Sequence, residues 1–314
     1  MHVHQAIALV ADAVTGVPGF ELPSQQAELL VSAALQVSVS ELKSLGEQPC
    51  SPAQCEFISR YLGSIPLIPV PLFLGYTEVN GIKLSVSAST LLPGTETSSL
   101  LGVASKLIRS SRATTIVELG TGCGVVPAVL ALLHPTCRFI VTEISEAAAT
   151  VARANVHQYQ LEKQISVLSG SWYDPLGEMD LRSKVDLIIS NPPYCSSYAI
   201  KSLPRGFLDY APRGAIDGGE DGLRAHKAVI DGSRAFLSAG GHLVLQTDTG
   251  QADRVSRYVE EIGGFGKADS ATGSGGEGRF VVARRIGRRV LLDEDAASVD
   301  VSGLQSLCLG LRST

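Results

Sequence analysis

Between residues 112 and 285, short apolar runs alternate with longer stretches in which apolar residues recur at helical spacing. Parallel strands need crossover connections, which are usually helices, so this alternation predicts a mostly parallel sheet with helices on both faces. We therefore expect a Rossmann-like α/β fold. The expected strands are residues 114–119, 138–142, 165–169, 184–190, 241–247 and 278–284, and the expected helices lie near 124–133, 146–157, 223–237 and 250–262.

The first expected strand runs into a glycine-rich turn, Gly120-Thr121-Gly122-Cys123-Gly124. Glycine tolerates positive φ and lets a ligand approach the backbone closely. The second strand is followed by Glu143. In doubly wound folds an acid at that place accepts hydrogen bonds from a ribose diol, and the ligand lies beyond the carboxyl ends of the strands. The turn and the acid together predict a site for an adenosine-containing cofactor.

The spacing of the glycines bears on which cofactor this is. A dinucleotide fingerprint, G-x-G-x-x-G, would need a glycine where the chain has Val125. Glycines two residues apart, at 120, 122 and 124, resemble the S-adenosylmethionine loop of class I methyltransferases. An NAD-dependent dehydrogenase would also need a proton donor near the nicotinamide, and no Ser-Tyr-Lys or His-Asp arrangement is evident in the sequence. S-adenosylmethionine is therefore the favoured cofactor.

The sequence Asn191-Pro192-Pro193-Tyr194 follows the expected strand 184–190. The side-chain oxygen of Asn191 can accept one N–H of a planar –NH2 group, and the Pro192 carbonyl can accept the other. The prolines stiffen the loop, and Tyr194 can cover the flat face of the acceptor. Methyl transfer depends largely on holding the nucleophile in line with the methyl group. We predict that Asn191, Pro192 and Tyr194 form the catalytic clamp for such an acceptor.

The Asn-Pro-Pro-Tyr motif resembles that of methyltransferases acting on amide or exocyclic amino nitrogens. The closer match is the HemK-type protein-glutamine methyltransferase family, which methylates the glutamine of the Gly-Gly-Gln loop in peptide-chain release factors. The resemblance covers nearly all of residues 20–285. It implies a seven-stranded class I methyltransferase sheet, a small N-terminal helical domain and a connecting β-hairpin.

The resemblance also assigns roles to individual residues. It implies that Asn191 and Pro192 hold the acceptor amide and that Glu143 binds the ribose of S-adenosylmethionine. The turn from Gly120 to Gly124 would hold the methionine end of the cofactor. The cofactor-binding candidates it implies, with Trp172 near the adenine, are Glu118, Gly120, Thr121, Gly122, Gly124, Glu143, Ile144, Ser171, Trp172 and Asn191.

Two departures from the family pattern concern the acceptor. The family usually reads Ile-Pro-Arg-Pro-Glu-Thr-Glu where this chain has Gly94 and Thr95 in place of the arginine and the second proline. It usually reads Phe-Glu-Pro where this chain has Ala211 in place of the acid. Whole-length resemblance favours a release-factor protein as the acceptor, whereas the departures favour a small-molecule N- or O-methyltransferase. An adenine in nucleic acid is disfavoured by a net charge of −5 and a pI of about 5.7. A non-catalytic binding module would have no use for the clamp.

The chain divides by pattern into four segments. Residues 1–70 read as short helices, 71–98 as a linker with a β-hairpin, 99–285 as the methyltransferase domain, and 286–314 as a tail without assignment. Asn80-Gly81 between alternating apolar runs predicts the hairpin turn. The helical segment is expected either to dock a macromolecular substrate or to pack on the main domain.

Several observations concern compartment and metals. No two of the six cysteines are spaced as C-x-x-C. The first residues lack a signal-peptide pattern, and no run of 18 apolar residues occurs. We therefore expect a cytoplasmic protein without a membrane span and without a metal site. Cys123 and Cys195 are expected to line the site as neutral thiols, because no nearby cation lowers their pKa.

Overall fold

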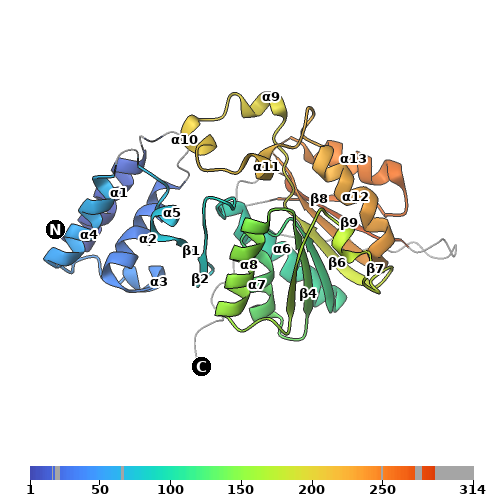
Figure 1. Cartoon of the computed structure of the whole chain (residues 1–314), viewed down its shortest axis with the longest axis horizontal. Coiled ribbons are helices and arrows are strands. Elements are labelled where there is room, and N and C mark those ends of the chain that lie inside the picture. The colour runs from blue at the N-terminus through green and yellow to red at the C-terminus, as the bar shows by residue number, and fades with distance from the viewer. Residues whose placement is uncertain (16, 18–21, 65–66, 249, 273–277, 287–314) are drawn as a thin grey trace. The chain divides into compact units, whose positions relative to one another are not determined.

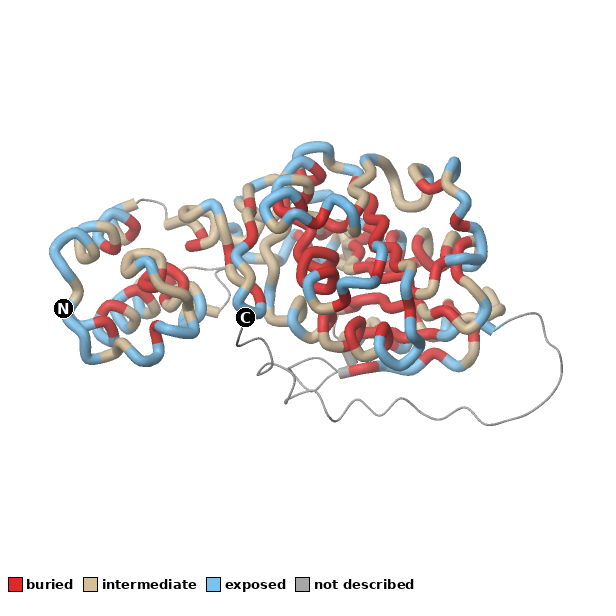
Figure 2. The backbone as a smooth tube through the Cα atoms, turned by 90° about the horizontal axis from the view of Figure 1, so that it is seen from below, coloured by how far each residue is buried: buried red, intermediate tan, exposed pale blue. Residues whose placement is uncertain are grey.

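The structure is a computed structural model, and it describes residues 1–15, 17, 22–64, 67–248, 250–272 and 278–286. By packing, the chain forms two compact units (Figure 1). The helical unit comprises Met1–Gly94 together with Lys201–Ala215, and the sheet unit comprises Thr95–Ile200 and the chain from Ile216 onward. Each unit has its own buried core (Figure 2).

The helical unit is built from short helices around an aliphatic core in which Leu30, Ile58 and Tyr61 are fully buried. A capping box opens α4: Gln54 N donates to Ser51 Oγ over 3.3 Å, and Ser51 N donates to Gln54 Oε1 over 2.7 Å. The helices of residues 1–94 are α1 (Val3–Thr15), α2 (Pro23–Leu35), α3 (Val39–Leu42), α4 (Pro52–Leu62) and α5 (Val70–Leu74).

Helix α5 replaces part of the expected linker. It begins after Pro69 and carries Pro71 in its first turn, where a missing N–H costs no helical hydrogen bond. The hairpin prediction is confirmed. Strands β1 (Tyr76–Val79) and β2 (Ile82–Ser85) pair antiparallel, and the turn residues Asn80 and Gly81 have φ of 52° and 77°, as a type I′ turn requires.

The sheet unit contains, within the described residues, a seven-stranded sheet of order β5-β4-β3-β6-β7-β9-β8. The first five strands in this order are parallel, whereas β9 runs antiparallel to β7 and β8 antiparallel to β9. This confirms the predicted Rossmann-like fold class. The strands are β3 (Thr115–Leu119), β4 (Arg138–Glu143), β5 (Ile165–Ser169), β6 (Val185–Ser190), β7 (Leu237–Gln246), β8 (Asp269–Thr272) and β9 (Gly278–Arg284).

Helices cover both faces of this sheet (Figure 1). On one face lie α6 (Thr95–Ser111), α7 (Val125–Leu133) and α8 (Glu146–Gln158), and on the other lie α12 (Arg224–Phe236) and α13 (Ala252–Ile262). The short elements η1 (Asp174–Leu176) and α9 (Ser197–Ile200) belong to the connections. The tail 286–314 lies almost wholly outside the described residues.

One segment leaves the sheet unit and joins the helical unit. Residues 201–215, which carry α10 (Arg205–Leu208) and the start of α11 (Arg213–Ile216), group with the helical unit by packing. Tyr210 from this segment packs against the helical core, and burial together with Tyr210 raises the pKa of Tyr61. The sequence boundaries had assigned this segment to the domain of residues 99–285. The helical unit is therefore assembled from two distant parts of the chain.

Candidate functional site

The glycine turn at the end of β3 has the backbone that the sequence predicts. Gly120, Gly122 and Gly124 have φ of 75°, 59° and 77°, a region that disfavours side chains. A Cβ on Gly124 would lie 3.1 Å from the Cβ of Ala152 in α8. Gly124 thus allows α7 to begin close against α8. The turn is fastened to β4, because Gly120 N donates to the Thr142 carbonyl over 2.9 Å.

Glu143 lies at the end of β4 and holds the glycine turn directly. One carboxylate oxygen accepts a hydrogen bond from Gly122 N over 2.9 Å, and the other accepts from Ser145 N over 2.9 Å. An ionised carboxylate has about four acceptor positions. Glu143 therefore keeps capacity for hydroxyl donors from a ligand while it fixes the loop beside it.

The remaining expected cofactor residues gather around this acid. Gly170 N donates to the Glu143 carbonyl over 2.9 Å, which brings the loop carrying Ser171 and Trp172 to the same edge. Trp172 has φ of 42°, an uncommon value for a bulky residue, and its ring lies beside Gly120. Ile144 is 75% exposed. An apolar side chain so exposed directly after Glu143 is suited to contact a planar ring system.

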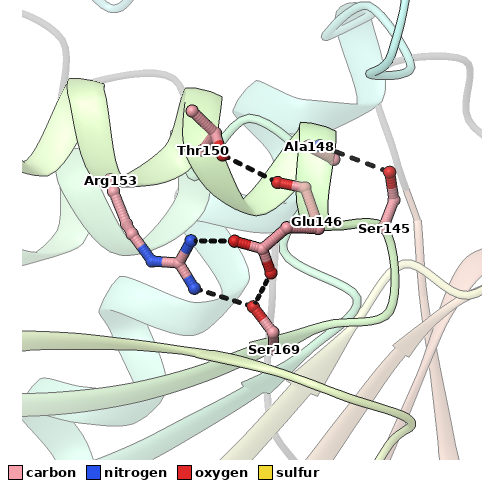
Figure 3. Close-up of polar contacts among 6 residues, drawn as sticks. All are labelled: Ser145, Glu146, Ala148, Thr150, Arg153 and Ser169. Atoms are coloured by element: carbon pink, nitrogen blue, oxygen red, sulfur yellow. Dashed lines mark hydrogen bonds and ion pairs between the residues drawn. The ribbon is translucent and has the colours of Figure 1, made fainter.

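A polar cluster missed by the sequence reasoning supports this loop (Figure 3). Arg153 in α8 contacts Glu146 Oε1 over 2.6 Å and donates to Ser169 Oγ over 2.7 Å, while the Ser169 hydroxyl donates to Glu146. The side chains are largely exposed, so their contribution to stability is small. Their effect is to tie the first turn of α8 to the end of β5, just before Ser171.

Glu118 is buried beneath the glycine turn, 3% exposed, and accepts a hydrogen bond from the Thr121 hydroxyl. The pKa of this carboxyl is raised to about 8, chiefly because burial disfavours the charged form. The Thr121 hydrogen bond lowers the pKa, whereas the charge of Glu143 raises it further. Glu118 is therefore mostly protonated at neutral pH in the ligand-free protein. A cation bound nearby would favour its ionised form.

We expect Glu118→Gln to flatten the pH dependence of stability. The folded pKa of about 8 lies above the ordinary value of 4.5, so the folded state holds the proton more tightly. Stability from this group is fully present below the unfolded pKa and is lost as pH rises toward and through 8. Wild type should lose about 3 kcal/mol of unfolding free energy from this source between pH 5 and pH 8.

Urea unfolding of the ligand-free protein at several pH values measures this effect. Glu118→Gln should remove most of the slope, whereas the exposed Glu178→Gln should leave it unchanged. Equal slopes in wild type and Glu118→Gln would contradict a protonated Glu118.

The Asn-Pro-Pro-Tyr loop begins where β6 ends. Asn191 Oδ1 is shut off from solvent and has no hydrogen-bond partner among the described residues. Buried polar atoms are nearly always satisfied. An unpartnered carbonyl-type oxygen in a stiff loop is therefore an acceptor position that a bound donor would complete. Pro192 beside it is buried.

The loop is braced by residues that the sequence analysis did not weigh. Cys195 N donates to the Ile216 carbonyl over 2.9 Å, and Gly218 N donates to the Cys195 carbonyl over 2.8 Å. Gln251 Nε2 donates to the Tyr194 carbonyl over 2.9 Å. A Cβ on Gly218 would lie 2.8 Å from the Pro193 carbonyl oxygen and 2.9 Å from the Tyr194 Cα. The backbone of residues 216–218 thus packs directly against the backbone of the Asn-Pro-Pro-Tyr loop.

The glycine turn and the Asn-Pro-Pro-Tyr loop meet at the carboxyl ends of neighbouring strands. Strand β3 lies between β4 and β6, and Leu119 pairs with Ser190. The Ser190 hydroxyl donates to the Leu119 carbonyl over 2.8 Å. The expected site residues therefore lie at the carboxyl ends of β3, β4, β5 and β6, all within the sheet unit.

Burial raises the pKa of the Cys123 thiol to about 12 and also raises that of Cys195.

The described part of the chain contains no group of three or more side chains suited to hold a metal ion. Among the same residues, none of the helices combines the length and the apolar character needed to cross a membrane.

Comparison with known proteins identifies the class. A family model described as "Methyltransferase small domain" matches residues 97–220. Among solved structures, the hMettl16 catalytic domain superposes with a TM-score of 0.52 at 16% identity, covering 73% of this chain and 92% of that one. At that identity the likeness concerns the fold alone. The family model thus describes a methyltransferase domain in the sheet unit, and the superposition gives the same fold.

Curated relatives give the family. The release factor glutamine methyltransferase of Gloeobacter violaceus is 32% identical over 215 residues, 68% of this chain and 74% of the relative. That of Geobacter sulfurreducens is 30% identical over 273 residues, 86% of this chain and 92% of the relative. The chain belongs to the family of release factor glutamine methyltransferases.

Proposed function

We propose that this protein transfers a methyl group from S-adenosylmethionine to the side-chain amide of a glutamine in a peptide-chain release factor. The observation that carries the proposal is the buried, unpartnered Oδ1 of Asn191 at the start of a rigid loop. It is an acceptor position suited to a planar –NH2 group. Membership of the release factor glutamine methyltransferase family supports the glutamine amide as that group.

The residues at the sheet edge fit S-adenosylmethionine. Glu143 would accept hydrogen bonds from the ribose hydroxyls, and Ile144 and Trp172 would flank the adenine, with Ser171 beside them. The turn of Gly120, Thr121, Gly122 and Gly124 would hold the methionine end, with the Glu118 carboxyl beneath its ammonium group. When bound, the cofactor supplies an electrophilic methyl group on a sulfonium.

The clamp would orient the acceptor rather than deprotonate it. Asn191 Oδ1 and the Pro192 carbonyl each accept one N–H of the amide, which aims the nitrogen at the methyl carbon. The nitrogen forms its new bond as the carbon–sulfur bond breaks. Asparagine is not a base, so the surplus proton leaves to water. Tyr194 keeps the loop in place and shields the acceptor from one side.

We expect Glu143→Gln to weaken cofactor binding by about 10- to 100-fold, because it removes the charge that strengthens the ribose hydrogen bonds and one acceptor for the glycine turn. Calorimetric titration with S-adenosylmethionine measures this. Glu178→Gln, which changes an exposed acid outside the polar cluster of Figure 3, should keep the affinity within about threefold. Unchanged affinity in Glu143→Gln would refute the ribose role.

Transfer of labelled methyl from S-adenosylmethionine to a purified bacterial release factor tests the proposed function. The control is the same release factor with its Gly-Gly-Gln glutamine changed to alanine. Label that is lost in the control supports the proposal. Cofactor binding without label on either protein would overturn the release-factor acceptor and favour a small-molecule nitrogen or oxygen, as Gly94 and Ala211 suggest. A protein acting on a translation factor would work in the cytoplasm.

A further inference from the structure

Trp172 has a backbone conformation that its own side chain disfavours. Its φ of 42° lies in the left-handed region, where a bulky residue is strained. Such a conformation persists only where the surrounding structure imposes it. The indole nevertheless has a defined place, because its Cζ3 would lie 3.8 Å from a Cβ on Gly120 in the glycine turn. Contacts outside Trp172 must therefore hold it there.

The backbone around Trp172 forms a tight turn. Asp174 N donates to the Ser171 carbonyl over 2.9 Å, so that Trp172 and Tyr173 are the two central residues of the turn. Glycine is the usual residue at a central turn position with positive φ. A tryptophan in that place needs support from beyond the turn itself.

The support comes from Tyr173, the next residue. Its hydroxyl donates to the Val229 carbonyl in α12 over 2.7 Å. Its ring stacks on that of Phe236, the last residue of the same helix, with the ring centres 5.0 Å apart and the planes 13° from parallel. Burial raises the pKa of the Tyr173 phenol, so it remains a hydrogen-bond donor at ordinary pH. The side chain that follows Trp172 is thus fixed to α12 both at its tip and along its face.

Gly232 of α12 makes room for this ring. A Cβ at that position would lie 2.3 Å from the Tyr173 ring atoms Cδ2 and Cε2. The ring cannot simply swing aside, because its hydroxyl and its face are both engaged. Glycine in the interior of a helix lowers stability relative to alanine. The helix therefore carries its least favourable ordinary residue where the Tyr173 ring docks.

We propose that Tyr173 is a positioning residue for cofactor binding: docked against Gly232, it holds Trp172 in its strained conformation, so that the indole is already in place to contact the adenine. The inference rests on the proposed use of S-adenosylmethionine and adds to it the contact between the loop after β5 and α12. Affinity depends on this contact, because a loop that is ordered beforehand need not be ordered by the ligand.

The first test uses tryptophan fluorescence, because Trp172 is the single tryptophan of the chain. In the ligand-free variants Gly232→Ala and Tyr173→Ala, we expect a shifted emission maximum and stronger quenching by acrylamide, since the indole becomes more exposed. Tyr258→Ala is the matched control. It truncates another partly buried tyrosine on the same core, whose hydroxyl donates to Asp231 of α12 over 2.8 Å, and it should leave the emission unchanged. Wild-type emission and quenching in Gly232→Ala or in Tyr173→Ala would refute the positioning role.

The second test measures binding by calorimetry. The ligands are S-adenosylmethionine and methylthioadenosine, which carries the adenosine but lacks the amino-acid end. Gly232→Ala and Tyr173→Ala should each weaken both ligands by about 10-fold, since the adenine is common to them. The double variant should bind no more weakly than Tyr173→Ala alone, because the added methyl group then meets no ring. Unchanged affinities in Gly232→Ala, a loss confined to S-adenosylmethionine, or additive losses in the double variant would overturn the proposal.

The same measurements separate this inference from the proposed function. If wild type binds both ligands and the variants respond as described, but no release factor is methylated, the positioning role stands and only the acceptor fails. If wild type binds neither ligand, the cofactor assignment fails and the inference falls with it. If wild type binds both and Gly232→Ala binds them equally well, the cofactor stands and the positioning role alone is wrong.

Discussion

Asn191→Ala should lose methyl transfer by about 1,000-fold in kcat without losing stability. The acceptor amide would keep its contact with the Pro192 carbonyl but would lose the partner that fixes its rotation. A single hydrogen bond does not hold the nitrogen in line with the methyl carbon. Because Asn191 Oδ1 has no partner within the described structure, its removal breaks no hydrogen bond of the folded protein. The melting temperature should therefore stay the same or rise.

Single-turnover kinetics, thermal unfolding and calorimetry on the same preparation check this result. Asn191→Asp adds a useful comparison, because it keeps an oxygen in place but introduces a charge beside the reacting centre. Affinity for S-adenosylmethionine should change little in either variant. Retained activity in Asn191→Ala would show that the acceptor is held elsewhere.

Gly218→Ala should reduce kcat by about 100-fold through displacement of the clamp. The added Cβ would lie 2.7 Å from the Gly222 carbonyl oxygen, 2.8 Å from that of Pro193 and 2.9 Å from the Tyr194 Cα. All three are backbone atoms, so the loops must move apart. A shift of about 1 Å in a positioned group can cost 100-fold in rate, and overpacking costs about 1–3 kcal/mol of stability.

Gly214→Ala is the matched control for this steric argument. A Cβ at Gly214 meets nothing within 4 Å, and the residue lies in the short helix α11, where alanine is favoured over glycine. Activity and melting temperature of Gly214→Ala should match wild type. If Gly218→Ala kept full activity, the close approach of Gly218 to the Asn-Pro-Pro-Tyr loop would have no part in holding the clamp.

Local sequence patterns predicted most strands of the sheet, because these strands are marked by short apolar runs. Strands β3, β4, β5, β6 and β9 lie within one residue of their expected bounds, because apolar runs ending in glycine, acid or proline are readable without tertiary context. Strand β7 begins four residues earlier than expected, at Leu237, since a shifted pairing with Val185 extends it. Strand β8 was missed, because Asp269–Thr272 has no apolar run and forms only by pairing with β9.

The candidate site divides in the same way. Its glycine turn, Glu143 and Asn191 were predictable, because each stands directly after a recognisable strand. Gln251 was not, since its significance comes from its hydrogen bond to the Tyr194 carbonyl, which lies far away in sequence. The absence of a partner for Asn191 Oδ1 among the described residues is also invisible in sequence, because it depends on burial.

The crossing of residues 201–215 into the helical unit has a consequence during protein synthesis. The ribosome completes residues 1–94 early, but the segment that packs Tyr210 on their core follows about 120 residues later. At ~5–20 residues per second, the nascent helices wait on the order of ten seconds for that segment. During this interval they fold without their last piece, and the glycine turn and the strands β3 to β6 are made before it arrives. The N-terminal helices are translated first, yet they reach their final packing only after strands β3 to β6 have left the ribosome.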